Sequence, residues 1–285
     1  MIDNIDLLHP ITLNVGLAIH NADWNWQDVC SPFTRIYYVT AGEADIILPS
    51  GRYALRPGHL YMIPAFMSHS YHCTSHFEHY YVHVYEEPAP HTGILEQWEF
   101  PVEVKAEAGD LYLFERLTQL NPQMRLPQSN PCSYDNDTSL SRSIRQNKQR
   151  SLALKVESRG ILFQLIARFF SKAHPRNEYH DSRIRQAIDY IQQHLSEPIS
   201  IEGLAADLCL CSDHFIRLFK NELRQTPCQY ITRKRVEQAQ LMLITQQLSV
   251  KEIAFRLGFD DPSYFIRLFK KTVGCTPQAY KEQQG

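Results

Sequence analysis

One hexapeptide occurs twice in the C-terminal third of the 285-residue chain, and it limits the possible folds more than any other feature. Residues 215–220 read Phe-Ile-Arg-Leu-Phe-Lys, and the same six residues recur at 265–270. The match continues through Thr226-Pro227 and Thr276-Pro277. Two copies are too few for a stacked repeat array. We therefore expect a tandem pair of similar small helical units.

Each copy has apolar residues at helical spacing, which predicts a short helix, a tight turn and a second short helix. A capping-box sequence at Ser249 and Glu252 and the pair Asp261-Pro262 mark two of the helix starts. A further helix precedes Pro198, and a long one joins the copies. The expected apolar faces are Ile201, Leu204, Ala205 and Leu208, then Phe215, Leu218, Phe219 and Leu223, and in the second copy Val250, Ile253, Ala254 and Leu257, then Phe265, Leu268, Phe269 and Val273. Residues 182–285 are thus predicted to be an all-α domain with two helix-turn-helix units.

Two such units have a physical use, because the second helix of each can lie in a major groove of DNA. Burial of the apolar stripe leaves an outward set on each of these helices, namely Asp213, Ile216, Arg217 and Lys220, and Ser263, Ile266, Arg267 and Lys270. An arginine can pair with guanine and an aspartate with cytosine, while Lys220, Lys270 and Lys271 suit phosphates. A single exposed arginine indicates only a solvated helix face, but recurrence of Arg217 as Arg267 favours contact with DNA.

The N-terminal half has a two-residue period instead, which is typical of half-buried strands. Residues 11–19 alternate strictly, and short runs follow at 35–40, 44–48, 60–63 and 79–85 with turns between them. Strands of this length and spacing suggest a small barrel or sandwich over residues 1–107. Residues 108–173 are predicted to be a helical connector, interrupted by an irregular loop at 121–137, and residues 174–181 a linker.

Charge is distributed unevenly along the chain. The net charge is -2, but residues 182–285 hold 14 Lys and Arg against 11 Asp and Glu, whereas residues 1–173 hold 14 against 18. The C-terminal domain is therefore weakly basic and the N-terminal part acidic, as expected for a sensor joined to a DNA-binding module. Seven cysteines without a C-x-x-C pair, and no signal or membrane-spanning segment, predict a cytoplasmic protein with reduced thiols.

Residues 184–284 resemble the DNA-binding domain of AraC/XylS-type transcription regulators. The resemblance rests on Ile253-Ala254, Gly258-Phe259, Ser263-Tyr264-Phe265, Phe269-Lys270 and Gly274-Cys275-Thr276-Pro277 running to Tyr280. It implies base contacts by Asp213, Ile216 and Arg217 in the first unit, and by Ser263, Tyr264 and Arg267 in the second. The first unit departs from the family pattern in having Cys209 and Arg224 where glycines are usual.

The N-terminal half resembles, more loosely, the cupin barrel of sugar-responsive members of that family. The matching stretches are 37–42, 55–60, Ile63-Pro64 and 69–71. The resemblance implies a small-molecule effector, possibly a carbohydrate, and we expect it to be contacted by Trp24, Tyr37, His69, His79, Tyr81 and His83. An aromatic-rich core with hydrogen-bonded histidines explains the same residues equally well. No metal or other cofactor is expected, because the H-x-H and later glutamate of metal-binding cupins are absent.

The helix at 160–170 has a wide apolar face. It is expected either to pair with a second copy, as in this family, or to pack on its own barrel; we favour the homodimer. The chain is thus predicted to be a DNA-binding regulator and not an enzyme, and the family resemblance implies an activator that contacts RNA polymerase. Two alternatives stay open, which are a metal-dependent cupin enzyme with a DNA-binding tail and a regulator whose barrel only dimerises.

Overall fold

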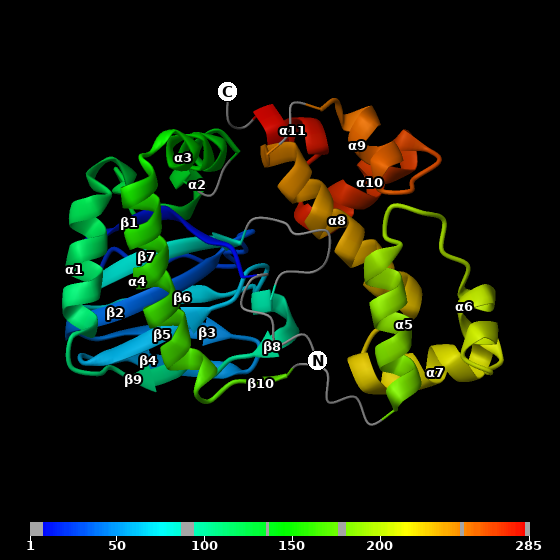
Figure 1. Cartoon of the computed structure of the whole chain (residues 1–285), viewed down its shortest axis with the longest axis horizontal. Coiled ribbons are helices and arrows are strands. Elements are labelled where there is room, and N and C mark those ends of the chain that lie inside the picture. Colours follow the sequence, from blue (N-terminus) through cyan, green and yellow to red (C-terminus); the bar gives the residue numbers. More distant parts are fainter. Residues whose placement is uncertain (1–7, 87–93, 135–136, 176–180, 246–247, 283–285) are drawn as a thin grey trace. The chain divides into compact units, whose positions relative to one another are not determined.

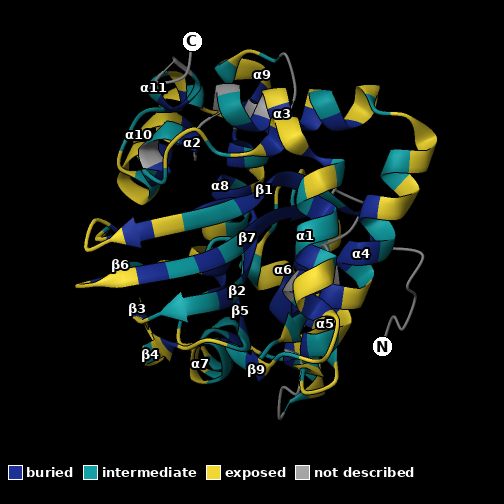
Figure 2. Ribbon diagram, turned by 90° about the vertical axis from the view of Figure 1, so that its left-hand side faces the viewer, coloured by how far each residue is buried: buried dark blue, intermediate teal, exposed yellow. Residues whose placement is uncertain are grey.

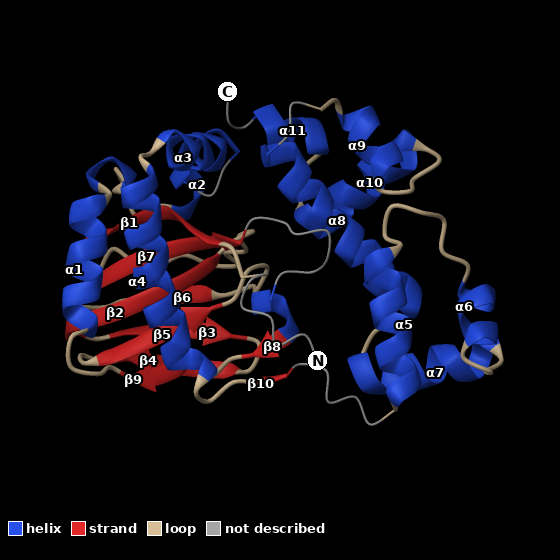
Figure 3. Ribbon diagram, viewed as in Figure 1, coloured by secondary structure: helices blue, strands red, loops and turns tan. Residues whose placement is uncertain are grey.

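The computed structural model describes residues 8–86, 94–134, 137–175, 181–245 and 248–282. They divide into two units, one ending at residue 175 and one beginning at residue 181 (Figure 1). All strands of the described residues belong to the first unit, whereas the second consists of helices and turns (Figure 3). This division of strands and helices confirms the two-part layout expected from the sequence.

The first unit is built on two antiparallel sheets. Its large sheet has the order β1 (Pro10–Asn21), β7 (His76–Glu86), β2 (Thr34–Gly42), β5 (His59–Ile63) and β9 (Glu103–Lys105). Its small sheet has the order β4 (Gly51–Leu55), β3 (Ala44–Leu48) and β6 (Ser70–His72), and a short pair joins β8 (Trp98–Glu99) to β10 (His174–Pro175). Among the described strands the large sheet ends at β1 and β9 and does not close on itself.

Successive residues of the central strands face two different cores, as the two-residue period requires. In β2, Ile36 belongs to a core beneath the helices, whereas Tyr37 belongs to a second core shared with the small sheet. In β7, Val82 and Tyr81 divide in the same way. The large sheet is therefore buried on both faces (Figure 2).

Helices cover one face of the large sheet. These are α1 (Asp110–Leu120) and α4 (Leu152–Phe170), which pack against each other and against β1. The wide apolar face of α4 is covered within its own unit, because Leu162, Leu165 and Phe169 are fully buried there. This burial agrees with the alternative in which the helix packs on its own unit, and the homodimer stays a prediction.

The stretch expected as an irregular loop is partly helical. It contains a 3-10 turn, η3 (Pro122–Met124), and α2 (Pro131–Tyr134), and α3 (Asp137–Gln149) follows. Met124 and Tyr134 are buried, so their apolar contacts hold this segment against the sheets. Another 3-10 turn, η2 (Ile94–Gln97), precedes β8.

The second unit has seven helices within residues 181–245 and 248–282, in agreement with the sequence. They are α5 (Ser182–Gln193), α6 (Ile201–Asp207), α7 (Ser212–Leu223), α8 (Pro227–Thr245), α9 (Val250–Arg256), α10 (Pro262–Val273) and α11 (Pro277–Glu282). The capping box of Ser249 and Glu252 forms as predicted, and the side chain of Asp261 caps α10. No helix among the described residues is long and apolar enough to cross a lipid bilayer.

The predicted linker, residues 174–181, falls mostly on residues outside the described ranges. His174 and Pro175 form strand β10 against Glu99 and Trp98. Asp181 accepts a hydrogen bond from the backbone of Arg183 and so caps the start of α5. Both described ends of this segment thus belong to secondary structure, one in each unit.

Candidate nucleic-acid interface and N-terminal cavity

The sequence repeat is also a repeat of side-chain packing. The rings of Phe215 and Phe219 meet edge to face with centroids 5.7 Å apart, and those of Phe265 and Phe269 do so at 5.8 Å. Each second phenylalanine contacts a tyrosine of the following helix, with Phe219 and Tyr230 at 5.6 Å and Phe269 and Tyr280 at 5.4 Å. The two aromatic clusters fix α7 and α10 by the same contacts, so equivalent residues of the two helices face outward.

The predicted DNA-contacting residues lie on these outward faces. On α7, Asp213, Arg217 and Lys220 are exposed and Ile216 is half-buried. On α10 the exposed residues are Ser263, Tyr264, Ile266, Arg267, Lys270 and Lys271. Each helix therefore presents an arginine one turn after a short polar residue, with lysines toward its C-terminal end.

Arg217 and Arg267 are free to reach a ligand. No hydrogen bond or ion pair of Arg217 occurs within the described part of the chain. Arg267 comes within 3.9 Å of the carboxylate of Asp261, but both side chains are mostly exposed and such a pair contributes little. Both guanidinium groups can therefore donate to base edges without breaking a stabilising contact.

The two helix-turn-helix units differ in their turns. Gly258 and Gly274 of the second helix-turn-helix unit have positive φ angles of 71° and 93°. The equivalent residues of the first helix-turn-helix unit, Cys209 and Arg224, both adopt a φ of 56°. The backbone of a residue with a Cβ is strained in this left-handed region, so the departures from the family pattern carry a conformational cost in the first helix-turn-helix unit.

Arg235 is a residue that the sequence reasoning missed. It lies in the middle of α8 and donates hydrogen bonds to the carbonyls of Leu195, Glu197 and Gly258 at 3.0, 2.6 and 3.1 Å. Its guanidinium also lies over the ring of Phe259. The arginine thereby ties the segment after α5 to the turn between α9 and α10. Three carbonyl partners from distant segments leave no local sequence pattern by which to find it.

Five of the six residues expected to contact an effector line one small cavity in the first unit. They are Trp24, Tyr37, His79, Tyr81 and His83. His69 lies behind them, where its Nε2 accepts a 2.7 Å hydrogen bond from the hydroxyl of Tyr71, which in turn contacts the hydroxyl of Tyr37 at 2.7 Å. The cavity has a volume of about 20 Å³, close to that of a single water molecule.

Aromatic rings fill most of the space between these residues. Trp24 stacks on Tyr71 with centroids 4.0 Å apart, and His20 stacks on Trp24 and on His79 at 5.2 and 5.6 Å. Nε2 of His20 and Nδ1 of His79 are buried without a hydrogen-bond partner among the described residues. The cluster is thus largely a packed aromatic core that keeps two unused polar atoms.

The histidines of this cluster are held neutral. Burial lowers the pKa of His69 to about 3, and the nearby Arg35 adds to the effect. Burial likewise lowers the pKa of His20, His79 and His83. His69 donates from Nδ1 to the carbonyl of Met67 at 2.8 Å, which leaves Nε2 as the acceptor. These rings therefore act as hydrogen-bonding groups and not as cations.

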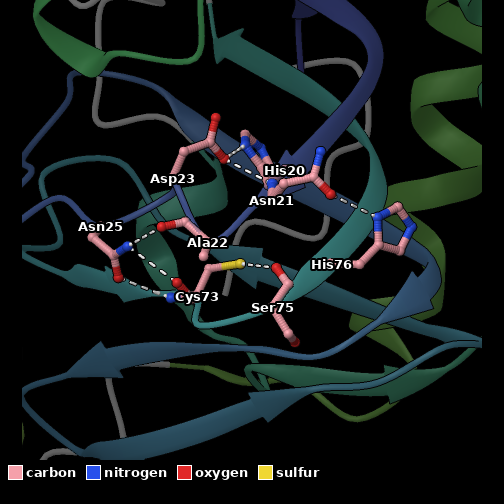
Figure 4. A network of polar contacts seen from close by, with 8 residues as sticks. All are labelled: His20, Asn21, Ala22, Asp23, Asn25, Cys73, Ser75 and His76. Atoms are coloured by element: carbon pink, nitrogen blue, oxygen red, sulfur yellow. Dashed lines mark hydrogen bonds and ion pairs between the residues drawn. The ribbon is translucent and has the colours of Figure 1, made fainter.

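A network of polar contacts fastens the turn that follows β1 (Figure 4). Asp23 accepts hydrogen bonds from the backbone of Asn21 at 3.0 Å and contacts Nδ1 of His20 at 3.3 Å. Asn25 exchanges hydrogen bonds with the backbone of Cys73, and donates to Ala22. The turn that contains Trp24 is thereby fastened to the β6–β7 connection.

Other lining residues were missed by the sequence reasoning. Ala18 and His20 continue the alternation of β1 and could have been found from it. Leu126, Ser129 and Tyr134 come from the segment expected as a loop, and Leu126 donates its backbone N–H to the hydroxyl of Tyr81 at 2.8 Å. Within the described ranges no three His, Cys, Asp or Glu side chains are placed to hold a metal ion.

Comparison with known proteins identifies the C-terminal unit. The sequence model of a family described as a helix-turn-helix domain matches residues 204–283. The regulatory protein PocR of Salmonella typhimurium is 36% identical over 104 residues, which are 36% of this chain and 34% of that protein. The arabinose operon regulatory protein of Escherichia coli is 32% identical over 102 residues, 35% of either protein. The chain thus covers about a third of the length of these relatives.

Solved structures match the same part of the chain. The C-terminal domain of the two-component response regulator yesN from Fusobacterium nucleatum is 30% identical, with a TM-score of 0.35, and the match covers 35% of this chain and 99% of that one. The family signature, the helix-turn-helix match and the regulatory relatives agree over one segment. The C-terminal unit is thus a helix-turn-helix domain similar to those of AraC/XylS-type transcription regulators, and the relatives that match it are regulatory proteins.

Proposed function

We propose that the chain is a sequence-specific DNA-binding transcription regulator controlled by a small molecule bound in its N-terminal unit. The helices α7 and α10 enter successive major-groove segments about one helical turn apart. The observation that carries the proposal is the repeated outward face, in which Arg217 and Arg267 stand exposed beside matching buried phenylalanine pairs.

Each residue of the face has a role set by its chemistry. Arg217 and Arg267 donate two hydrogen bonds to guanine, Asp213 accepts from cytosine, and Ile216 contacts a thymine methyl group. Ser263 and Tyr264 complete the second set of base contacts. The lysines of the same helices, Lys220, Lys270 and Lys271, bind phosphates and set the register of the protein on the duplex.

DNA binding is tested with the full chain and the DNA upstream of its own gene. Fluorescence anisotropy compares the wild type with the double variant Arg217→Ala plus Arg267→Ala. Loss of two base contacts worth about 1–3 kcal/mol each should lower specific affinity by about thirtyfold or more. Arg185→Ala, an exposed arginine of α5, is the matched control and should bind as the wild type does. Unchanged affinity and selectivity in the double variant would refute the assignment.

The effector part of the proposal concerns the N-terminal unit. In this proposal its two sheets form a cupin-like barrel. The aromatic cavity binds a small hydrogen-bonding ligand such as a carbohydrate. The rings of Trp24 and His20, which stack on each other with centroids 5.2 Å apart, line the cavity, and the unpartnered nitrogens of His20 and His79 offer hydrogen bonds to hydroxyl groups. Because the cavity holds about 20 Å³, ligand entry requires the η3–α2 segment to move away from Tyr81.

A thermal-shift screen against a panel of sugars tests this part separately. A sugar present at about 100 times its Kd should add about 2.7 kcal/mol of stability, and Trp24→Leu should abolish the shift. No shift with any sugar would favour the alternative in which the N-terminal unit only dimerises. The small cavity is the observation that supports that alternative.

Dimerisation, activation and contact with RNA polymerase complete the proposal. The homodimer is supported by the apolar side chains Leu111 and Tyr112, which α1 leaves exposed. Ligand binding would shift the population toward the arrangement in which both helix-turn-helix units reach DNA. Light scattering of the wild type and of Tyr112→Ser tests the dimer, and transcription in vitro with purified polymerase tests activation.

A further inference from the structure

A second and larger cavity lies in the first unit, away from the aromatic cluster. It holds about 310 Å³ and is bounded by the start of β1, the end of α3 and the first turns of α4. It shares no lining residue with the cavity around Trp24. A volume of this size is at the lower end of those that bind small organic ligands.

The charged residues that line this cavity are all cations. They are Lys148, Arg150, Lys155 and Arg159. None of the four pairs with a carboxylate in the described part of the chain: Lys155 donates to the carbonyl of Lys148 at 2.8 Å, and Arg150 donates to the carbonyl of Leu154 and the hydroxyl of Ser158. The neighbouring acid, Glu157, is engaged by Arg116 at 2.6 Å. Four uncompensated positive charges around one cavity favour an anion.

Two further features point into the same space. Thr12 is 1% exposed and lines the cavity, and its Oγ1 has no hydrogen-bond partner among the described residues. The N-terminus of α4, a helix of 19 residues capped by Ser151, lies beside Leu152 at the cavity edge. Its unpaired backbone N–H groups and its dipole add positive potential there. A buried hydroxyl without a partner is costly unless something else bonds to it.

The rest of the lining is apolar. Ile11 and Leu162 contribute to it, and Leu152 and Val156 are exposed to 76% and 63%. Large aliphatic side chains exposed beside clustered cations suit a molecule with an anionic head and a hydrocarbon body. We propose that this cavity binds a small organic carboxylate, with its head at Arg159 and Thr12 and its body against Leu152 and Val156.

The proposal goes beyond control through the aromatic cavity, because it adds a site of different chemistry. Both cavities contact β1, one at Pro10–Thr12 and the other at Ala18 and His20. Binding at the cationic cavity is measured without DNA and without sugar. Its failure would therefore leave the proposed function untouched, and the reverse also holds.

Isothermal titration of the full chain with hexanoate, hexanol and acetate tests the proposal. Hexanoate should bind saturably, whereas hexanol lacks the charge and acetate lacks the hydrocarbon body, so each should bind at least about tenfold more weakly. Raising the salt concentration should weaken hexanoate binding. Both decisive results need only the wild-type protein. Equal binding of hexanol and hexanoate, or no saturable binding of hexanoate, would overturn the proposal.

Variants locate the site. Arg159→Gln should lower hexanoate affinity about tenfold, and Thr12→Val should lower it less, because a neutral hydrogen bond is weaker than a charge-assisted one. Arg159 makes no hydrogen bond within the described residues, so its replacement leaves the fold intact. Arg145→Gln, an exposed arginine of α3 outside the cavity, is the control and should bind as the wild type does. Unchanged affinity in Arg159→Gln contradicts the placement of the carboxylate.

Discussion

Arg235 and Gly258 approach each other so closely that a methyl group on the glycine would lie 2.9 Å from Nη2 of the arginine. The same added atom would lie 3.1 Å from the carbonyls of Ser196 and Glu197. Gly258 is thus required twice, by its positive φ and by the space that the arginine occupies. The pair joins the two helix-turn-helix units through α8, which sets the position of one recognition helix against the other.

Replacing Gly258 by alanine should destabilise the C-terminal unit. The left-handed backbone costs about 1–2 kcal/mol for a residue with a Cβ, and displacement of Arg235 adds the loss of its hydrogen bonds. Urea unfolding of the full chain measures the effect. Gly203→Ala is the matched control, because Gly203 lies in α6, where an added Cβ would make only ordinary contacts with the side chain of Ser200 at 3.5 and 3.6 Å, and it should stabilise by about 0.5–1 kcal/mol. Equal effects of the two substitutions would contradict this account of the Arg235 contact.

The strained turns of the first helix-turn-helix unit predict the opposite effect, which is stabilisation when glycine is introduced. Cys209→Gly and Arg224→Gly should each stabilise the protein by about 0.5–1 kcal/mol, because glycine adopts a φ of 56° without the steric cost of a Cβ. The free energy of unfolding in urea is the measurement. Lys220→Gly, at a regular helical position of α7, should destabilise by about 1 kcal/mol and serves as the control. Destabilisation by both turn substitutions would show that these turns are not strained.

Acid should destabilise the N-terminal unit. Burial lowers the pKa of His20, His69, His79 and His83 below the ordinary value of 6.5, so the unfolded chain binds protons that the folded unit excludes. Stability is therefore lost as the pH drops through and below 6.5, and for His69, whose folded pKa lies near 3, the loss is about 2 kcal/mol at pH 5. For His69 the loss continues down to about pH 3.

Tryptophan fluorescence follows this unfolding, since Trp24 lies inside the cluster. The thermal midpoint should fall steadily between pH 7 and pH 5. His69→Gln should reduce the slope of the unfolding free energy against pH by the contribution of one bound proton. His76→Gln, at an exposed position, should leave the slope unchanged. A midpoint independent of pH over this range would mean that the four rings are not held neutral by burial.

The C-terminal unit could be predicted almost completely from the sequence, because the information that specifies it is local. Helical spacing places Phe215 and Phe265 inside and Arg217 and Arg267 outside, and a short-range cap such as Ser249 marks where a helix begins. Arg235 escaped prediction because its partners lie far away in the sequence.

The N-terminal unit was predicted less well for the same reason. The alternation of β7 correctly put His79, Tyr81 and His83 on one face. It could not show that Tyr134 and Leu126 come back to cover them, because that contact depends on long-range packing. Strands of two or three residues, such as β8 and β6, are too short for a period to be recognised. The cationic cavity likewise assembles from segments at residues 10–12 and 147–162.

The lysines of the recognition helices should control the salt dependence of DNA binding and not its selectivity. Each of Lys220→Ala and Lys270→Ala should reduce the slope of log affinity against log salt concentration by about 1, with weaker binding to all sequences alike. Anisotropy titrations at several salt concentrations measure the slope. Lys172→Ala, at an exposed position of the N-terminal unit outside both cavities, is the control and should leave the slope unchanged. A change in base preference with an unchanged slope would reassign these lysines from phosphates to bases.

The central claim is that α7 and α10 read two separate groups of bases. The most direct measurement selects bound sequences from a random DNA library with the wild type, Arg217→Ala and Arg267→Ala. The account predicts that each variant loses preference at one group of bases only, and that the two groups lie about 10 base pairs apart. Loss of preference at the same bases in both variants, or at none in either, would contradict it.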